Sequence, residues 1–295
     1  MCGKGLVPVR NGCNAGGQGL RPAHPPDRGH LLIPMMQDDV SFELRLARSD
    51  RDLQAAQRLR YAVFVTELGG DGPLVDHDAR LEKDEFDAVF DHLILIDPRR
   101  NAAELDDVVG VYRLLPGRRV GAAGRFYSEG EYDLAPLKAS GRRLLELGRS
   151  CVHKDYRGST AMFHLWNGLA DYVAEHGIEV LFGVASFHGT NAEVLAQPLA
   201  YLHHHHLAPP PLRVRARAAQ FRAMDVLPAA ALDRKLAMLG TPALIKAYLR
   251  LGGFVGDGAS VDHAFNTTDV CLVMDTGRMS AKHRDFYTRK QGRTL

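Results

Sequence analysis

The sequence predicts one mixed α/β domain built around a central sheet, and two patterns favour this fold class. Four apolar segments, each bounded by turn residues, have the length of buried strands: 92–96, 108–115, 143–152 and 178–187. Between the last two, apolar side chains recur every three or four residues from Met162 to Val173, as on the buried face of a helix that ends at Gly177. Strand, helix and strand in this order form a crossover unit, which joins parallel strands of one sheet.

The chain on either side of this unit supplies further elements. Alternating apolar and charged residues over 42–46 predict a half-buried strand, and Ser49 or Asp50 then caps a helix that ends before Gly69. Toward the other end we expect three helices and a last strand, at 191–204, 228–239, 242–251 and 269–274. The second and third of these helices belong to a helical, basic insert at about 209–252.

The predicted domain spans residues 41–276. Residues 1–40 contain seven Gly and five Pro and no hydrophobic period, so burial cannot offset the entropy of ordering them, and we expect a disordered leader. This leader is either a flexible tail or an extension upstream of a start at Met35 or Met36. A polar tail, 277–295, follows the domain.

Composition argues against several classes of protein. Thirty-seven Lys and Arg against thirty-five Asp and Glu give a net charge of +2, so no nucleic-acid partner is expected. No apolar run reaches the roughly 18 residues of a membrane span, and no signal peptide is evident. Four Cys in 295 residues do not make a disulfide framework. The sequence therefore predicts a cytoplasmic protein, and it leaves open peripheral contact with the inner face of the membrane.

Two patterns raise the question of metal or thiol chemistry. The four consecutive histidines 203–206 cannot all face one ion from a single helix, so no metal site is predicted, and no separate cofactor is expected. Cys151 with His153 could form a nucleophilic pair, although a free Cys is more often simply buried.

Several local motifs resemble one acyltransferase family. The element order is similar to the GNAT acyltransferase fold, which implies a GNAT-like mixed central sheet with flanking helices and a helical, basic C-terminal elaboration. Within residues 42–275, the motifs resemble those of acyl-homoserine-lactone synthases and, more closely, of ornithine N-acyltransferases. They are RYAVF at 60–64, DEFD at 84–87, DHL at 91–93, GVYRLLP at 110–116, ELGRSCV at 146–152, YLHHHHLAP at 201–209 and FNTTDV at 265–270.

The resemblance implies a reaction and its partners. A 3-hydroxylated acyl chain would pass from acyl carrier protein to the α-amine of L-ornithine, giving lyso-ornithine lipid. Two alternatives stay open: an acyl-homoserine-lactone synthase, and a catalytically silent GNAT-like module that binds lipid or carrier protein. Both expected partners of the enzyme, acyl carrier protein and L-ornithine, follow from the resemblance.

Glu146 and Arg149 are the predicted catalytic residues. They stand three apart on one strand, so regular alternation would send them to opposite faces, whereas a bulge at Gly148 could bring both to one cleft. A carboxylate there can take the proton of an attacking amine, and backbone N–H groups freed by a bulge can stabilise the oxyanion. The alternative is a structural ion pair of Glu146 with Arg149 or with Arg113.

Six further residues are predicted to bind substrate, at the positions Arg60, Phe64, Asp84, Asp87, Asp91 and Arg113. An arginine can hold the acceptor's carboxylate through two hydrogen bonds, and buried arginines require acidic partners. The three aspartates suit the second, cationic amine of ornithine. For any one of them, a solvated loop position is the alternative.

Arg157 and Gly158 are predicted to meet the phosphate of a carrier-bound phosphopantetheine, because they precede a helix N-terminus. The alternative is an ordinary strand-to-helix turn. Farther on, the insert is rich in Arg and Lys, so it could dock an acidic carrier protein or an anionic membrane.

Overall fold

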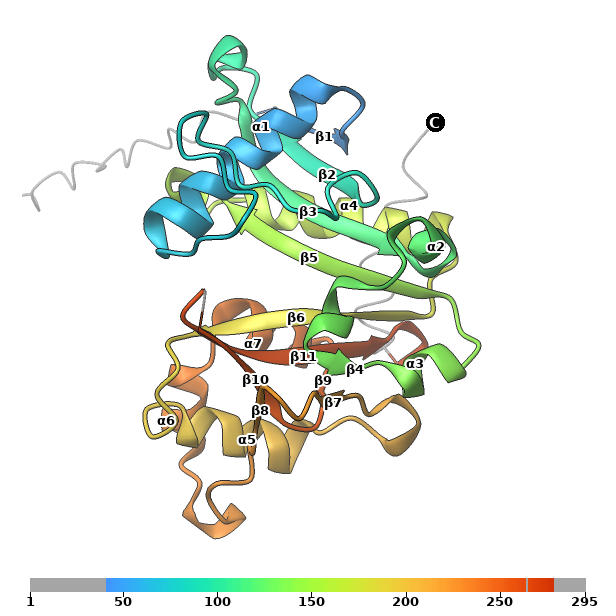
Figure 1. The fold of residues 1–295 in the computed structure, drawn as a ribbon, viewed down its shortest axis with the longest axis vertical. Coiled ribbons are helices and arrows are strands. Elements are labelled where there is room, and N and C mark those ends of the chain that lie inside the picture. The colour runs from blue at the N-terminus through green and yellow to red at the C-terminus, as the bar shows by residue number, and fades with distance from the viewer. Residues whose placement is uncertain (1–40, 264, 279–295) are drawn as a thin grey trace, which may run out of the picture. The chain divides into compact units, whose positions relative to one another are not determined.

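The computed structural model describes residues 41–263 and 265–278, so the predicted leader and all but the first two residues of the predicted tail lie outside the described residues. Within them, a mixed sheet of nine strands has the order β1-β2-β3-β5-β6-β11-β10-β8, and β9 pairs with β11 (Figure 1). The strands are β1 (Glu43–Leu46), β2 (Asp91–Ile96), β3 (Val108–Pro116), β5 (Leu144–Val152), β6 (Val180–His188), β8 (Phe221–Arg222), β9 (Phe254–Val255), β10 (Ala259–Asp262) and β11 (Thr267–Asp275). A separate ladder joins β4 (Tyr132–Asp133) to β7 (Arg215–Ala216). The predicted mixed α/β fold class is confirmed.

Helices cover both faces of the sheet. They are α1 (Asp50–Arg60), α2 (Val120–Ala123), α3 (Ala135–Ala139), α4 (Ala161–Glu175), α5 (Ala196–His206), α6 (Arg234–Gly240) and α7 (Ala243–Arg250). Successive residues of a strand face opposite sides, and β2 shows the consequence. Leu93 and Leu95 pack in one core cluster with Leu165 of α4, whereas Ile94 packs in another with Ala56 of α1.

The helix starts follow the caps that the sequence carries. Ser49 caps α1, and its side chain accepts a hydrogen bond from the Asp52 N–H at 3.2 Å, as predicted. The helix predicted from residue 228 starts later, at Arg234, because Asp233 caps it by accepting from two backbone N–H groups. The predicted insert also contains the short strands β7 and β8, which the sequence analysis missed.

The pairing of β5 creates the feature that positions the site. Opposite β3, Val111 pairs with Cys151 and Arg113 with Gly148, so β5 contains one extra residue, and the predicted bulge is confirmed. The residue in the left-handed region is Arg149, with a φ of 47°, and not the glycine beside it. Toward β6, parallel pairing covers only 144–146 of β5, and beyond that point the two strands diverge (Figure 1).

Candidate active site

A cavity of about 270 Å³ lies between the diverging parts of β5 and β6. Gly183 of β6 lines this cavity and approaches the Leu147 backbone so closely that a Cβ there would collide with the Leu147 carbonyl oxygen. One part of the lining is apolar and comes mainly from β6, β11 and α7: Leu181, Val184, Leu244, Leu272, Val273 and Met274. Beyond Glu146, the edge of β5 that would otherwise pair with β6 is free to face this cavity.

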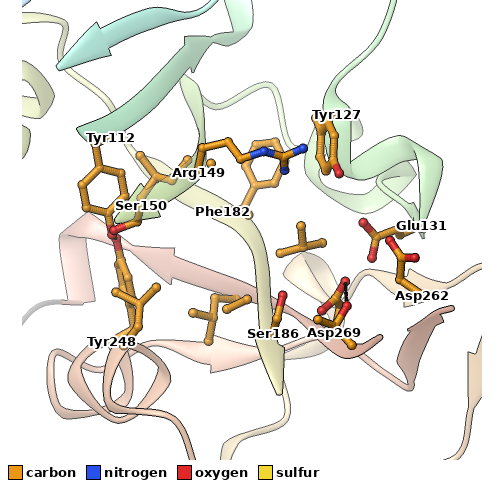
Figure 2. Close-up of a pocket in the computed structure, with 18 of the residues that line it drawn as sticks. Tyr112, Tyr127, Glu131, Arg149, Ser150, Phe182, Ser186, Tyr248, Asp262 and Asp269 are labelled. Atoms are coloured by element: carbon orange, nitrogen blue, oxygen red, sulfur yellow. Dashed lines mark hydrogen bonds between the residues drawn. The ribbon is translucent and has the colours of Figure 1, made fainter. Parts of the chain in front are cut away.

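The polar part of the cavity carries charges of both signs. Arg149 extends from the bulge toward Tyr127, and its guanidinium carbon lies 5.1 Å from the centre of that ring (Figure 2). The carboxylates of Glu131, Asp262 and Asp269 gather on one side of the cavity, while Tyr112 and Tyr248 lie on the other (Figure 2). The hydroxyl groups of these two tyrosines are 2.9 Å apart and share a hydrogen bond.

Arg149 is held in place by two acids behind it. Its Nε donates to Glu82 at 3.1 Å, and its Nη2 lies 3.3 Å from a carboxylate oxygen of Asp84. The left-handed backbone costs on the order of 1 kcal/mol for a residue with a side chain, which these two ion pairs help to offset. Phe64 also lines the cavity, and its ring centre lies 5.9 Å from the guanidinium of Arg149. The structure therefore brings these two predicted site residues together.

Four more of the predicted residues lie behind Arg149, in a buried network of three arginines and three acids. Its members are Arg60, Glu82, Asp84, Asp87, Arg113 and Arg149. Arg60 is fully buried and pairs with Glu82 and Asp87. Arg113 donates to Asp84 at 2.6 Å and to Asp87 at 3.0 Å. Burial opposes ionisation of Asp87, yet Arg60 and Arg113 hold the pKa of its carboxyl well below the usual range.

Glu146 does not reach the cavity with Arg149. Both of its carboxylate oxygens accept hydrogen bonds from the backbone, from the Tyr127 N–H at 2.8 Å and the Ser128 N–H at 2.6 Å. Burial nevertheless raises the pKa of Glu146, because the side chain is almost without contact with solvent. The bulge therefore places Arg149 against the Tyr127 ring, whereas Glu146 accepts hydrogen bonds from the backbone at residues 127–128. We correct the expectation that both side chains open into one cleft.

Three other predicted residues lie away from the cavity. Asp91 pairs with Arg119 and accepts a hydrogen bond from the Tyr172 hydroxyl at 2.7 Å. Arg157 donates to the Val152 carbonyl at 3.1 Å and lies 2.7 Å from a carboxylate oxygen of Glu67, on the outside of the strand-to-helix turn. Gly158 occupies that turn with a φ of 81°. None of the three lines the cavity.

The aspartates predicted to bind a substrate cation pair with arginines of the protein and do not line the cavity. Asp84 and Asp87 already neutralise protein arginines, and Asp91 faces Arg119. The acids that do line the cavity, Glu131, Asp262 and Asp269, were not assigned a role from the sequence. The one signal for them was the FNTTDV motif, which places Asp269 ahead of an apolar strand.

The remaining alternatives find little support in the described residues. Burial raises the pKa of the Cys151 thiol to about 12, and Cys151 does not line the cavity, so a thiolate nucleophile is disfavoured. In residues 41–263 and 265–278, no group of three or more His, Cys, Asp or Glu is arranged to hold a metal ion. His204 instead makes a hydrogen bond of 2.9 Å with the Leu227 carbonyl.

Comparison with known proteins finds chains of similar sequence. The model of the acetyltransferase (GNAT) domain family matches residues 59–167. An L-ornithine N(alpha)-acyltransferase of Rhodobacter capsulatus is 64% identical over 251 residues, which cover 85% of this chain and 96% of that protein. A protein of the same name from Brucella abortus is 41% identical over 255 residues, covering 86% of this chain and 91% of that protein. The solved structure of FeeM, an N-acyl amino acid synthase from uncultured soil microbes, is 10% identical with a TM-score of 0.46, covering 80% of this chain and 92% of that one.

Proposed function

The chain belongs to the L-ornithine N(alpha)-acyltransferase family, and we propose that it transfers a 3-hydroxyacyl chain from acyl carrier protein to the α-amine of L-ornithine, forming lyso-ornithine lipid. The observation that carries this proposal is a single cavity between β5 and β6 with an apolar part and a charged part. An acyl chain requires the first, and an amino acid requires the second. A catalytically silent module would not need an apolar part and a charged part in the same cavity.

Arg149 is the residue that we assign to the acceptor's carboxylate. It lines the cavity, and Glu82 and Asp84 fix the direction of its guanidinium. A guanidinium held in this way can bind a carboxylate through two charge-assisted hydrogen bonds. Phe64 and Tyr127 flank it and limit where the amino acid can lie.

Attack of the neutral α-amine on the thioester forms the C–N bond and breaks the C–S bond. The nitrogen loses one proton, and the carrier's sulfur leaves as a thiolate that gains one, so the products are the amide and the free thiol. The negative oxygen of the tetrahedral intermediate requires hydrogen-bond donors, and the β5 backbone beside the bulge faces the cavity there. Glu146 acts here as a positioning residue, because both of its oxygens hold the turn that carries Tyr127.

The decisive experiment uses the purified full chain with 3-hydroxyacyl carrier protein and a panel of amino acids. We expect an amide with L-ornithine, identified by mass spectrometry, and formation of one free thiol for each amide. A parallel reaction supplies S-adenosylmethionine in place of ornithine. A lactone product would overturn the proposal in favour of a lactone synthase, and absence of any product would favour the silent module.

We also propose peripheral contact of α6 with anionic lipid. Leu236 and Leu239 are 54% and 78% exposed on this helix, and Arg234 and Lys235 beside them are exposed as well. Apolar side chains flanked by cations are typical of helices that lie on a membrane surface. No helix in the described part of the chain is long and apolar enough to cross a bilayer.

Sedimentation with vesicles tests this contact. We expect binding to vesicles that contain phosphatidylglycerol, weaker binding to pure phosphatidylcholine, and further weakening by salt. Leu239→Glu should reduce binding while leaving acyl transfer in solution unchanged. Equal sedimentation of this variant and the parent protein would refute the assignment of the contact to α6.

A further inference from the structure

The acidic side of the cavity combines residues from three separate segments. Glu131 follows the turn that contains Tyr127, Asp269 lies near the start of β11, and Asp262 ends β10. Glu131 and Asp269 are only 9% and 5% exposed, yet both line the cavity (Figure 2). Two buried carboxylates of like charge are unfavourable unless a cation or a proton compensates them.

Within the described residues, hydrogen bonds from the protein satisfy these two carboxylates only in part. Glu131 Oε2 and Asp269 Oδ1 are buried without a hydrogen-bond partner, and neither side chain forms an ion pair there. Asp269 also accepts a long hydrogen bond, of 3.3 Å, from the Thr267 hydroxyl to its other oxygen, and the Ser186 side chain interacts with the same carboxylate. An unsatisfied buried acceptor destabilises a protein by about 1–3 kcal/mol, so a ligand that donates hydrogen bonds to these two oxygens would recover part of that free energy.

Without a cation nearby, protonation neutralises the carboxylates of Glu131 and Asp269. Burial, together with the charges of Asp269 and Asp262, raises the pKa of Glu131 to about 8. Burial also raises the pKa of Asp269. A ligand that brings its own positive charge and N–H donors would replace these protons, pair with both carboxylates and satisfy the two free oxygens.

On this basis we propose that Glu131 and Asp269 bind the side-chain ammonium of a diamino-acid acceptor, and that they select such acceptors over neutral amino acids. Asp262 contributes further negative charge from the same side. This inference rests on the proposed function, in which Arg149 binds the acceptor's carboxylate. The cavity then offers an anion site and a cation site to one amino acid, with the α-amine held between them for attack on the thioester.

An ammonium fits these acids better than a metal ion does. A bound metal would require a set of converging ligands, and no group of three or more candidate ligand side chains among the described residues is arranged to hold one. An ammonium needs only two or three acceptors, since it has three N–H donors. Glu131, with its free Oε2, and Asp269, with its free Oδ1, supply such acceptors.

The test compares L-ornithine with L-norvaline, which has the same carbon chain but lacks the second amine. The variants Glu131→Gln and Asp269→Asn keep the shape of each side chain and remove its charge. For each variant we expect the ratio of kcat/KM for ornithine to that for norvaline to fall on the order of 10- to 100-fold, the effect of one hydrogen bond to a charged group. The control, Glu193→Gln, changes an exposed carboxylate outside the cavity and should leave the ratio unchanged.

The outcomes separate this inference from the proposed function. If the parent protein acylates ornithine and both variants keep its preference over norvaline, the inference is wrong and the proposed function stands. If the parent protein acylates neither amino acid, the proposed function itself fails. Loss of the preference in the variants, with amide still formed from norvaline, supports both.

A second measurement uses the parent protein alone. Titration calorimetry with ornithine in buffers of different ionisation enthalpy measures how many protons leave on binding. Near pH 7, we expect ornithine binding to release protons from the two acids and norvaline binding to release none from them. The reason is that only the second amine of ornithine replaces protons on the acids. Equal proton exchange for both ligands would overturn the inference, even if a variant failed to fold.

Discussion

Two groups of buried acids lie close to β5 and differ in how their charges are compensated. Behind the bulge, Glu82, Asp84 and Asp87 pair with three arginines of the protein. Across the cavity, Glu131 and Asp269 have buried oxygens without any partner in the described residues. Arginines of the protein compensate the charges of the first group, whereas no ion pair among the described residues compensates those of the second.

The difference bears on the aspartates that the sequence predicts to bind a substrate cation. A substrate cation was assigned to Asp84, Asp87 and Asp91, which the structure shows paired with Arg113, Arg60 and Arg119. Of these three aspartates, only Asp84 also pairs with Arg149 and supports it directly. Arg149 is the one member of the network that also lines the cavity, so it links the two groups.

The largest effect is expected where the paired group is broken. Arg60→Met would leave Glu82 and Asp87 buried without their main partner, which should lower the free energy of unfolding by roughly 3–5 kcal/mol. Urea denaturation measures this loss. The matched control Arg234→Met, on an exposed helix, should stay within about 0.5 kcal/mol of the parent protein. Equal stability of the two variants would contradict the division into scaffold and site.

The link between the two groups is tested at Arg149. Arg149→Lys keeps the charge but removes the planar pair of donors, so we expect kcat/KM to fall roughly 100-fold. The loss should be similar for ornithine and norvaline, since both carry the carboxylate that Arg149 binds. A loss confined to ornithine would place Arg149 with the cation site instead. Steady-state kinetics with both acceptors distinguishes these results.

The unpaired group should reveal itself in the pH dependence of stability. Glu131 has a pKa of about 8 in the fold and about 4.3 when unfolded, so the folded state binds more protons between these values. The free energy of unfolding therefore falls as the pH rises from about 4 to about 8. Glu131→Gln removes this titration, so between pH 5 and pH 8 the free energy of unfolding of the parent protein should fall by roughly 3–4 kcal/mol more than that of the variant. Parallel stability curves for variant and parent would show that Glu131 is already compensated.

Local patterns predicted the fold well, because strands and helices follow from the spacing of apolar residues. The bulge could also be predicted, since Gly148 stands in the interior of an otherwise strand-like segment. The direction of Glu146 could not, because it depends on a turn at residues 127–128 that belongs to another segment. The acidic site was missed for the same reason. Glu131 and Asp269 are far apart in the sequence, and nothing local indicates that their partners are missing.

The smallest effect is expected at Glu146, which belongs with the paired acids although its partners are backbone N–H groups. Glu146→Gln leaves one of these N–H groups facing an amide donor, which should lower the free energy of unfolding by about 1.5 kcal/mol. As a positioning residue, Glu146 should affect kcat by about tenfold or less, and the pH profile of kcat should keep its shape. A well-folded variant that loses more than about 1,000-fold in kcat would identify Glu146 as the base, because removing a proton acceptor from the reaction has effects of that size.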